Sequence, residues 1–238
     1  MLARVGNPLE NPDPTPRDLP QVPRQSTEKG ADMIVDSITL RAACLELAPL
    51  LEGGLLQKIS QLDEQDLVLH FRRPGVTHRL LIRLAPDDAR VVLVEGPLSP
   101  AREPSAFTML MRKHLSGLPL LKVHQKGMER SVWLDFQGWS LVVEIPGRSN
   151  NIFLVAESGR LAGMLNPERE GSRRLRPGRD YAVPPRPDRP EALDISGADL
   201  PALLSPALGE PVARALARAV FGLPPQQCRL ACRLAGLE

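Results

Sequence analysis

The spacing of apolar residues between 36 and 156 changes twice from a helical period to a strand period, and this repeated change most constrains the fold. Apolar residues about 3.6 positions apart predict an amphipathic helix, whereas alternation predicts a half-buried strand. Each predicted helix precedes four short strands whose turns contain Gly, Pro or Asp. Two sets of antiparallel strands, each headed by a helix, predict an α+β fold: an antiparallel β-sandwich with flanking helices.

The two predicted helices have recognisable ends. The first begins at Asp36 or Ser37, either of which can cap it, and stops at Gly53. Its apolar residues are expected to face the core: Ile38, Leu40, Ala42, Leu45, Leu47 and Leu50. The second covers residues 105–116 and ends before Gly117. The predicted strands are 55–61, 66–72, 78–84 and 90–94, then 120–125, 131–136, 140–145 and 152–156.

Proline marks the segments outside this patterned centre. The chain contains 25 prolines, about twice the usual share of ~5%. We predict four regions: a disordered Pro-rich tail at 1–32, an α/β sandwich domain at 33–165, a basic Pro/Arg-rich linker at 166–192, and a short helical segment at 193–238. Met33 opens the patterned sequence and is the expected physiological start. The last two helices, at 210–220 and 225–235, form a helix–turn–helix pair around Gly222.

Composition excludes several classes of protein. A hydrophobic content of 42% can supply a core, and a net charge of +2 gives no global basic field, so any nucleic-acid site must come from local clustering. Three cysteines argue against a disulfide scaffold and favour a reducing, cytoplasmic location; Cys228 and Cys232 are expected in the core. The sequence contains no run of 18 apolar residues, so it predicts no membrane-spanning helix.

Enzyme chemistry has no recognisable signature in the sequence. Motifs for a serine hydrolase, a zinc protease, a P-loop or a dinucleotide fold are absent. The carboxylates are spread singly rather than paired, as an acid/base site would require. The four histidines are scattered along the chain: His70, His78, His114 and His124. We therefore predict no metal, no cofactor and no catalytic residues, and a protein that is not an enzyme.

Basic clusters occur at the end of the second predicted helix and in two turns. Arg112, Lys113 and His114 either offset the helix dipole or form an edge that binds anions. Glu129 and Arg130, at the turn that begins with Gly127, form either a solvated ion pair or a recognition pair for phosphate and hydroxyl groups. The polar turn at 147–151 and the arginines of the final helix pair leave the same choice open.

Four segments, taken in order, resemble the N-terminal module of the NFACT family. They are the Leu40-Arg41-Ala42 segment that follows Asp36, then FTMLMRKHL, KGMERSVWLDF and VVEIPGRSNNIFLV. The resemblance runs from Met33 to about Pro187, and residues 196–238 resemble the start of the family's helix-hairpin-helix region. The family includes RqcH, FbpA (named for fibronectin binding) and NEMF.

The resemblance implies a fold similar to the N-terminal domain of formamidopyrimidine-DNA glycosylases. The glycosylase nucleophile is absent, because Ile34 and Val35 follow Met33. Family members bind large ribosomal subunits that still carry a peptidyl-tRNA, and bacterial members recruit alanyl-tRNA for an untemplated C-terminal alanine tail. The ribosome forms the peptide bond, so the resemblance implies a tRNA-binding factor rather than an enzyme.

The family motifs also imply the residues that contact RNA. Glu129–Arg130 matches an Asp-Arg pair, with Glu in place of Asp, and Glu144 and Arg148 match an E-I-x-G-R segment. The full set of candidate tRNA- and RNA-binding residues is Asp36, Arg41, Arg112, Lys113, His114, Glu129, Arg130, Glu144, Arg148, Asn150 and Asn151.

One departure from the family pattern lies at the end of the chain. The family continues through a complete pair of helical hairpins into a long coiled coil, whereas this chain stops at Glu238, which predicts weakened ribosome binding. Three other interpretations stay open: a fragment of a fibronectin-binding adhesin, a non-catalytic nucleic-acid-binding relative of DNA glycosylases, and a scaffold whose hairpins dock a missing partner.

Overall fold

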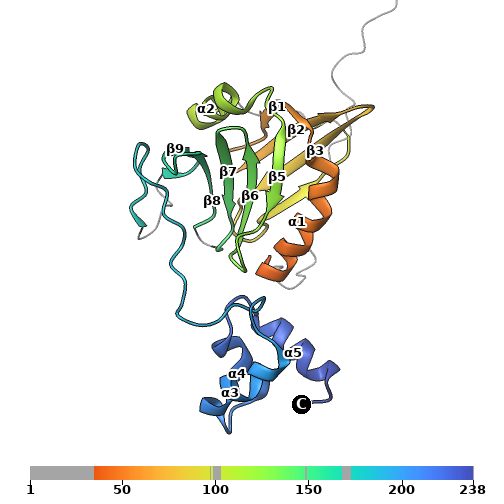
Figure 1. Cartoon of the computed structure of the whole chain (residues 1–238). Helices are drawn as coiled ribbons and strands as arrows, with labels where there is room; N and C mark the ends of the chain where they lie inside the picture. The colour runs from red at the N-terminus through yellow and green to blue at the C-terminus, as the bar shows by residue number, and fades with distance from the viewer. Residues whose placement is uncertain (1–34, 97, 99–102, 148, 168–172, 238) are drawn as a thin grey trace, which may run out of the picture. The chain divides into compact units, whose positions relative to one another are not determined.

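The computed structural model describes residues 35–96, 98, 103–147, 149–167 and 173–237 (Figure 1). The predicted tail at 1–32, the expected start at Met33 and the candidate residue Arg148 lie outside the described residues.

Two antiparallel sheets form the centre of the described chain. The first half consists of α1 (Ser37–Leu51), β1 (Leu55–Gln61), β2 (Asp66–Arg73), β3 (Val76–Arg83) and β4 (Arg90–Leu93). The second half consists of α2 (Ala106–Leu115), β5 (Leu120–His124), β6 (Ser131–Phe136), β7 (Trp139–Glu144), β8 (Asn151–Ala156) and β9 (Leu161–Met164). The strand orders are β1-β2-β3-β4 and β5-β6-β7-β8-β9. All eight predicted strands are present within two residues of their expected ends, and β9 was not predicted.

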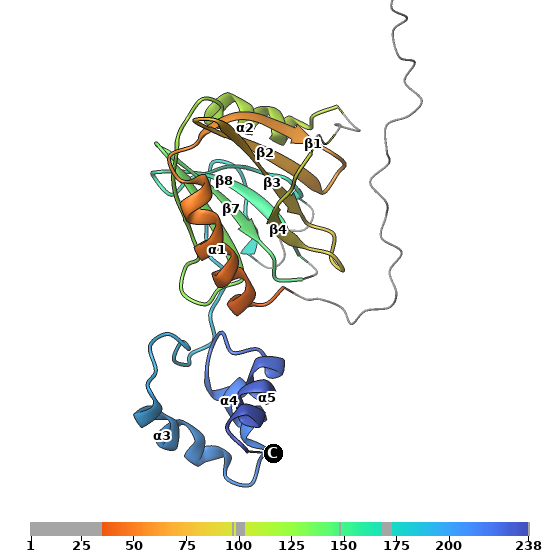
Figure 2. The ribbon, with the colours of Figure 1, turned by 90° about the vertical axis from the view of Figure 1, so that its right-hand side faces the viewer.

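The two sheets pack face to face and enclose one hydrophobic core, as the side view shows (Figure 2). Alternate residues of β2 point inward, so Leu67, Leu69 and Phe71 are fully buried. Phe71 stacks on Phe136 of the opposite sheet with ring centroids 6.3 Å apart. The predicted α+β fold with two antiparallel sheets is therefore confirmed.

Helix α1 lies beside β5 (Figure 1), and its core face matches the predicted one at Leu40 and Leu47 but not at Leu45 and Leu50. Its buried apolar residues are Leu40, Cys44, Leu47 and Leu51. Leu45, expected in the core, is 67% exposed, and Leu50 is also exposed. The reason is geometric: positions 40, 44, 47 and 51 follow one another every three or four residues on one side of a helix, and position 45 is turned away from it.

Helix α2 contacts β1 and β9 and turns one apolar face to the core. Phe107, Met111 and Leu115 are buried there. β9 approaches α2 closely through Gly163, where a Cβ atom would lie only 2.7 Å from the side chain of Leu110. This glycine allows the fifth strand to reach its place against the helix.

The described part of the predicted linker packs on the outer face of the five-stranded sheet. Leu175 is 4% exposed and joins a cluster with Trp133 and Phe153. The ring of Tyr181 lies 5.7 Å from that of Trp133 and 5.3 Å from that of Phe153. We call residues 173–182 the covering segment, because they shield apolar side chains that would otherwise face water.

The C-terminal part consists of short helices: α3 (Leu200–Leu204), α4 (Val212–Ala219), α5 (Pro225–Leu234) and the 3-10 turns η3 (Gly197–Asp199) and η4 (Ser205–Ala207). α4 and α5 contact each other. Cys228 and Cys232 are buried, as the sequence predicted. Among the described helices, none combines the length and apolar character needed to cross a membrane.

Candidate functional site

A cavity of about 590 Å³ joins several segments that are distant in sequence. It is formed by the start of α1, the β5–β6 turn, the end of β7, residues 184–189 and the turn between α4 and α5. Its lining comprises Asp36, Ser37, Met128, Glu129, Arg130, Ser131, Glu144, Pro146, Pro184, Pro185, Arg186, Arg189, Phe221, Gly222, Leu223, Pro224, Pro225, Gln226 and Arg229. Four candidate residues from the sequence therefore meet here: Asp36, Glu129, Arg130 and Glu144.

Asp36 has both a structural and an electrostatic role at the cavity. Its Oδ1 accepts a hydrogen bond of 2.8 Å from the backbone N–H of Thr39 and so caps α1. Its Oδ2 lies 3.4 Å from Nε2 of Gln227 in α5. The same carboxylate acts electrostatically on Arg130. One side chain thus connects the first helix, the last helix and the cationic wall.

Arg130 is the half-buried cation of the cavity wall. Its Nη2 donates to the carbonyl oxygen of Pro146, which fixes the side chain across the turn after β7. Burial lowers the pKa of Arg130, and the charge of Asp36 acts in the opposite direction. The guanidinium remains protonated at neutral pH, since even a lowered arginine pKa stays far above 7. Arg130 therefore presents a positive charge whose hydration is already reduced.

Glu129 is buried and only half satisfied. The residue is 5% exposed, and its Oε1 accepts a hydrogen bond of 2.8 Å from Nε of Arg186. Its Oε2 has no hydrogen-bond partner in the part of the chain that the structure describes. A buried acceptor without a donor costs stability, on the order of 1–3 kcal/mol. A hydrogen-bond donor that reached this oxygen would remove that cost.

Arg186 links Glu129 to the helical part. Its Nη1 lies 2.5 Å from Oε1 of Glu191, and its guanidinium carbon lies 5.9 Å from the centre of the Phe221 ring. Arg189, nearby on the same segment, donates to the carbonyl oxygens of Ala217 and Arg218 at the end of α4. Both arginines thus hold the cavity together while lining it.

Two glycines allow the segments around the cavity to approach each other. A Cβ atom at Gly127 would lie 2.4 Å from the carboxylate oxygens of Glu191, and one at Gly222 would lie 2.2 Å from Cβ of Met128. Both glycines have positive φ angles, +53° and +87°, which other residues rarely adopt. Gly222 allows the α4–α5 turn to contact the β5–β6 turn, and Gly127 allows that same β5–β6 turn to contact Glu191.

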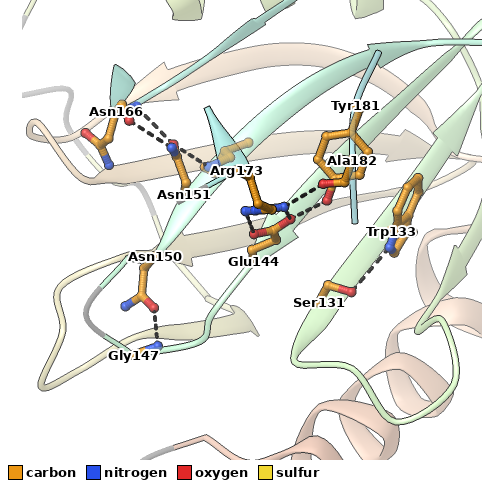
Figure 3. A network of polar contacts seen from close by, with 11 residues as sticks. Ser131, Trp133, Glu144, Gly147, Asn150, Asn151, Asn166, Arg173, Tyr181 and Ala182 are labelled. Carbon is orange, nitrogen blue, oxygen red and sulfur yellow. Dashed lines mark hydrogen bonds and ion pairs between the residues drawn. The ribbon is translucent and has the colours of Figure 1, made fainter. Parts of the chain in front are cut away.

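Glu144 also lines the cavity, but its carboxylate is fully engaged by the covering segment (Figure 3). Arg173 donates to both oxygens, at 2.8 and 2.5 Å, and the hydroxyl of Tyr181 donates to Oε1. Burial and the neighbouring Glu144 raise the pKa of Tyr181 above its ordinary value, so its hydroxyl stays protonated and remains a donor. Glu144 anchors the covering segment and leaves no oxygen for a ligand.

The Arg112, Lys113 and His114 cluster lies outside the cavity. Nε and Nη2 of Arg112 donate to the carbonyl oxygen of Ile59 at 3.0 and 2.6 Å, which ties α2 to β1. The ring of His114 lies 4.2 Å from that of Trp139, and Lys113 is exposed. Two of the three side chains therefore serve packing.

Asn150 and Asn151 are fully buried and bonded within the fold (Figure 3). Asn150 accepts from the N–H of Gly147 and donates to the carbonyl oxygen of Leu84. Asn151 forms hydrogen bonds with the backbone of Asn166 on both sides of its amide. Since the backbone at a buried turn needs such partners, we assign these two side chains to the fold and not to a ligand.

Arg41 lies on α1 outside the cavity lining. It is close enough to Cys44 to act electrostatically on its thiol, although burial dominates and raises the pKa of Cys44 to about 11. Arg148 lies outside the described residues, so its place relative to the cavity is not part of the site's geometry.

The set proposed from the sequence omits most of the lining residues, among them Arg186, Arg189, Phe221 and Arg229, although Arg229 belongs to the final helix pair whose arginines the sequence singled out. Arg186 and Arg189 stood in a Pro/Arg-rich stretch that predicted only a linker. The alternation of Arg and Pro there was a usable signal, because prolines hold the backbone extended and present arginines at fixed positions. Phe221 lies in the turn that was recognised, but nothing local marked it as a lining residue.

The arrangement favours an anionic ligand that also carries hydrogen-bond donors. Four arginines meet three carboxylates at the cavity, and two of the carboxylates already have basic partners. The first turn of α5 lines the cavity through Pro224, Pro225 and Gln226. In the described part of the chain, no group of three His, Cys, Asp or Glu side chains could hold a metal ion.

Comparison with known proteins places the chain in a family. The family described as the NFACT N-terminal and middle domains matches residues 36–238. The Rqc2 homolog RqcH of Bacillus subtilis is 32% identical over 168 residues, which cover 65% of this chain and 30% of that protein. The Rqc2 homolog RqcH of Streptococcus suis is 30% identical over 186 residues, which cover 73% of this chain and 34% of that protein. The chain thus spans about a third of these curated relatives.

A solved structure shares the fold. The N-terminal domain of the fibronectin-binding protein PavA from Streptococcus pneumoniae superposes with a TM-score of 0.74 and 28% identity. The match covers 84% of this chain and 79% of that structure.

Proposed function

The chain belongs to the NFACT family, and we propose that it is a tRNA-binding module of a ribosome-associated quality-control factor. The observation that carries this proposal is the convergence of Asp36 with the adjacent pair Glu129–Arg130 on one cavity, because Asp36 is distant from that pair in sequence and all three residues match family motifs. The proposal assigns the other candidate residues lesser or structural roles.

The cavity offers each kind of contact that an RNA strand needs. Arg130 and Arg229 supply positive charge for phosphate, and arginine forms paired hydrogen bonds to phosphate oxygens. The free Oε2 of Glu129 would accept from a 2′-hydroxyl or a base amino group. Phe221 presents an aromatic ring, on which a base can stack.

The wider role follows the family. We propose that the module contacts large ribosomal subunits carrying peptidyl-tRNA and helps to position alanyl-tRNA for an untemplated alanine tail, as a cytoplasmic factor without catalytic residues of its own. The α4–α5 pair would act as a helix-hairpin-helix element that holds RNA backbone, and the sandwich would use a glycosylase-like fold without glycosylase chemistry.

The test is the salt dependence of tRNA binding by the whole chain. Fluorescence anisotropy with purified tRNA should show a linear fall of log affinity with log salt, since phosphate contacts release counterions. Arg130→Ala should weaken binding roughly tenfold and reduce the slope by about 1, the effect of losing one phosphate contact. Arg130→Lys keeps the positive charge but loses the forked guanidinium group, so its affinity for tRNA should lie between those of the parent and Arg130→Ala.

Arg160→Ala is the matched control. Arg160 is exposed in the turn between β8 and β9 and does not line the cavity, so its loss removes the same charge elsewhere. Equal binding by Arg130→Ala and the parent, with both variants folded by circular dichroism, would reject the cavity as the tRNA site.

A fibronectin-binding function is the second candidate, because the similar PavA structure is that of a fibronectin-binding protein. Binding of the chain to immobilised fibronectin, unaffected by competing tRNA, would support it. Loss of that binding together with tRNA binding in Arg130→Ala would indicate one shared polyanion site instead.

A further inference from the structure

A row of basic residues crosses the outer face of the four-stranded sheet. In the antiparallel register Lys58 of β1 lies opposite His70 of β2, and His70 lies opposite Arg79 of β3. Directly opposed residues point to the same side of a sheet, with Cβ atoms about 4.5–5.5 Å apart. The neighbouring positions Leu69 and Leu80 are buried in the core, so the basic row faces outward.

A fourth basic residue extends this row on the same face. Arg72 lies two positions after His70 on β2, and it is exposed. Its Nη1 donates to the hydroxyl of Thr77 at 3.2 Å, which leaves its charge without a carboxylate partner. We call Lys58, His70, Arg72 and Arg79 the basic face.

The carboxylates of this sheet do not neutralise the basic face. Asp66 pairs with Arg83 at 2.6 Å, and Asp88 pairs with Arg83 and Arg90 at 2.9 and 2.7 Å. Within the described chain, no carboxylate lies within ion-pair distance of Lys58, Arg72 or Arg79.

Placing like charges directly opposite one another lowers the stability of a sheet. His70 responds to its neighbours: burial, then the charges of Lys58 and Arg79, lower its pKa. Its Nε2 lies 3.2 Å from the hydroxyl of Ser60. Within the described chain, the cations of this row form hydrogen bonds but no ion pairs, so their charge is available to a partner outside the chain.

We propose that the basic face is a second RNA contact, which binds the phosphate backbone and is separate from the cavity. None of the described residues that line the cavity belongs to β1, β2 or β3. The row crosses three strands and so spans about 10 Å, a length over which a nucleic-acid backbone carries several charges. The choice of RNA over another polyanion rests on the proposed function.

The basic face would recognise the charge of an RNA backbone and not its base sequence. Its lysine and arginines can reach phosphate oxygens, whereas none of the residues paired with them on β1, β2 and β3 carries an aromatic ring other than His70. Contact here would orient a tRNA or a ribosomal RNA helix whose other part occupies the cavity. Two contacts on one RNA raise affinity by making the second binding event intramolecular.

The experiment uses the double variant Lys58→Gln/Arg79→Gln of the whole chain in anisotropy titrations with purified tRNA. We expect a roughly tenfold or greater loss of affinity and a salt slope reduced by about 2, since two phosphate contacts are lost. The control Arg160→Gln/Arg179→Gln removes the same charge from exposed positions outside both surfaces and should bind within twofold of the parent.

Three results would overturn the proposal: parental affinity in the double variant, equal loss in the control, or unchanged tRNA binding with lost binding of poly-glutamate. Lost binding of poly-glutamate with unchanged binding of tRNA would indicate that the basic face binds an acidic protein partner. The cavity is judged separately. If Arg130→Ala binds tRNA normally and the double variant does not, the basic face is supported and the cavity proposal is rejected. If Arg130→Ala loses tRNA binding and the double variant does not, the cavity is supported and the basic face is rejected.

Discussion

The two outer faces of the sandwich use charged residues in opposite ways. On the five-stranded sheet the covering segment is anchored by Glu144, whose oxygens accept from Arg173 and Tyr181. On the four-stranded sheet Lys58, His70 and Arg79 face one another without carboxylate partners in the described chain. Charge that is buried and paired holds this fold together, whereas charge that is exposed and unpaired costs stability and is available for binding.

The largest effect is expected on the covered face. Glu144→Gln keeps the size of the side chain but leaves Arg173, whose side chain is 15% exposed, without its charged partner. Breaking a buried ion pair by removing one partner typically costs about 3–5 kcal/mol, so we expect a loss near the lower end of that range. Urea denaturation followed by tryptophan fluorescence measures it, since Trp133 lies against Tyr181.

The double variant Glu144→Gln/Arg173→Gln is the control for this experiment. It removes both charges and should recover a substantial part of the lost stability, because no buried charge is left unpaired. A loss below about 0.5 kcal/mol in Glu144→Gln would contradict the contrast between the two faces.

A smaller effect, of opposite sign, is expected for the stability of variants in the basic face. Lys58→Gln/Arg79→Gln relieves the repulsion across the row, so the free energy of unfolding should rise by up to about 1 kcal/mol. The same variant is expected to bind tRNA less well, which would separate stability from binding. A clear destabilisation would mean that these side chains support the fold, and the basic face would lose its status as a binding surface.

The smallest expected effect is a change in pH dependence at His70. Its lowered pKa means that the folded chain takes up this proton less readily than the unfolded chain. Stability should therefore fall as the pH drops through the ordinary histidine pKa of about 6.5 toward the folded value. His70→Gln should lessen this fall between pH 7.5 and 5.5; an unchanged profile would show that His70 does not experience the charges beside it.

Local pattern predicted the elements of this fold well, because strand alternation and glycine turns are properties of neighbouring residues. It failed at β9, a strand of four residues with a glycine in its middle, and at part of the core face of α1, where Cys44 is buried and Leu45 is exposed. A short strand with little β-branched content becomes a strand only because a sheet edge is there to pair with it.

The candidate site was harder to predict, because its geometry depends on pairs far apart in sequence. Asn150 and Asn151 looked like exposed donors in a polar turn, yet they satisfy buried backbone groups. Arg186 looked like part of a linker, yet it reaches Glu129, 57 residues earlier in the chain. Of the candidates that the structure describes, Asp36, Glu129, Arg130 and Glu144 line the cavity, and Glu144 is already engaged by Arg173 and Tyr181.

The most direct test of the cavity as the tRNA site is ultraviolet cross-linking of the whole chain to tRNA, with the linked peptides identified by mass spectrometry. Our account predicts links in the peptides that contain Arg130 and Phe221, and their loss in Arg130→Ala while links at the basic face persist. Links confined to peptides that line neither the cavity nor the basic face would contradict it.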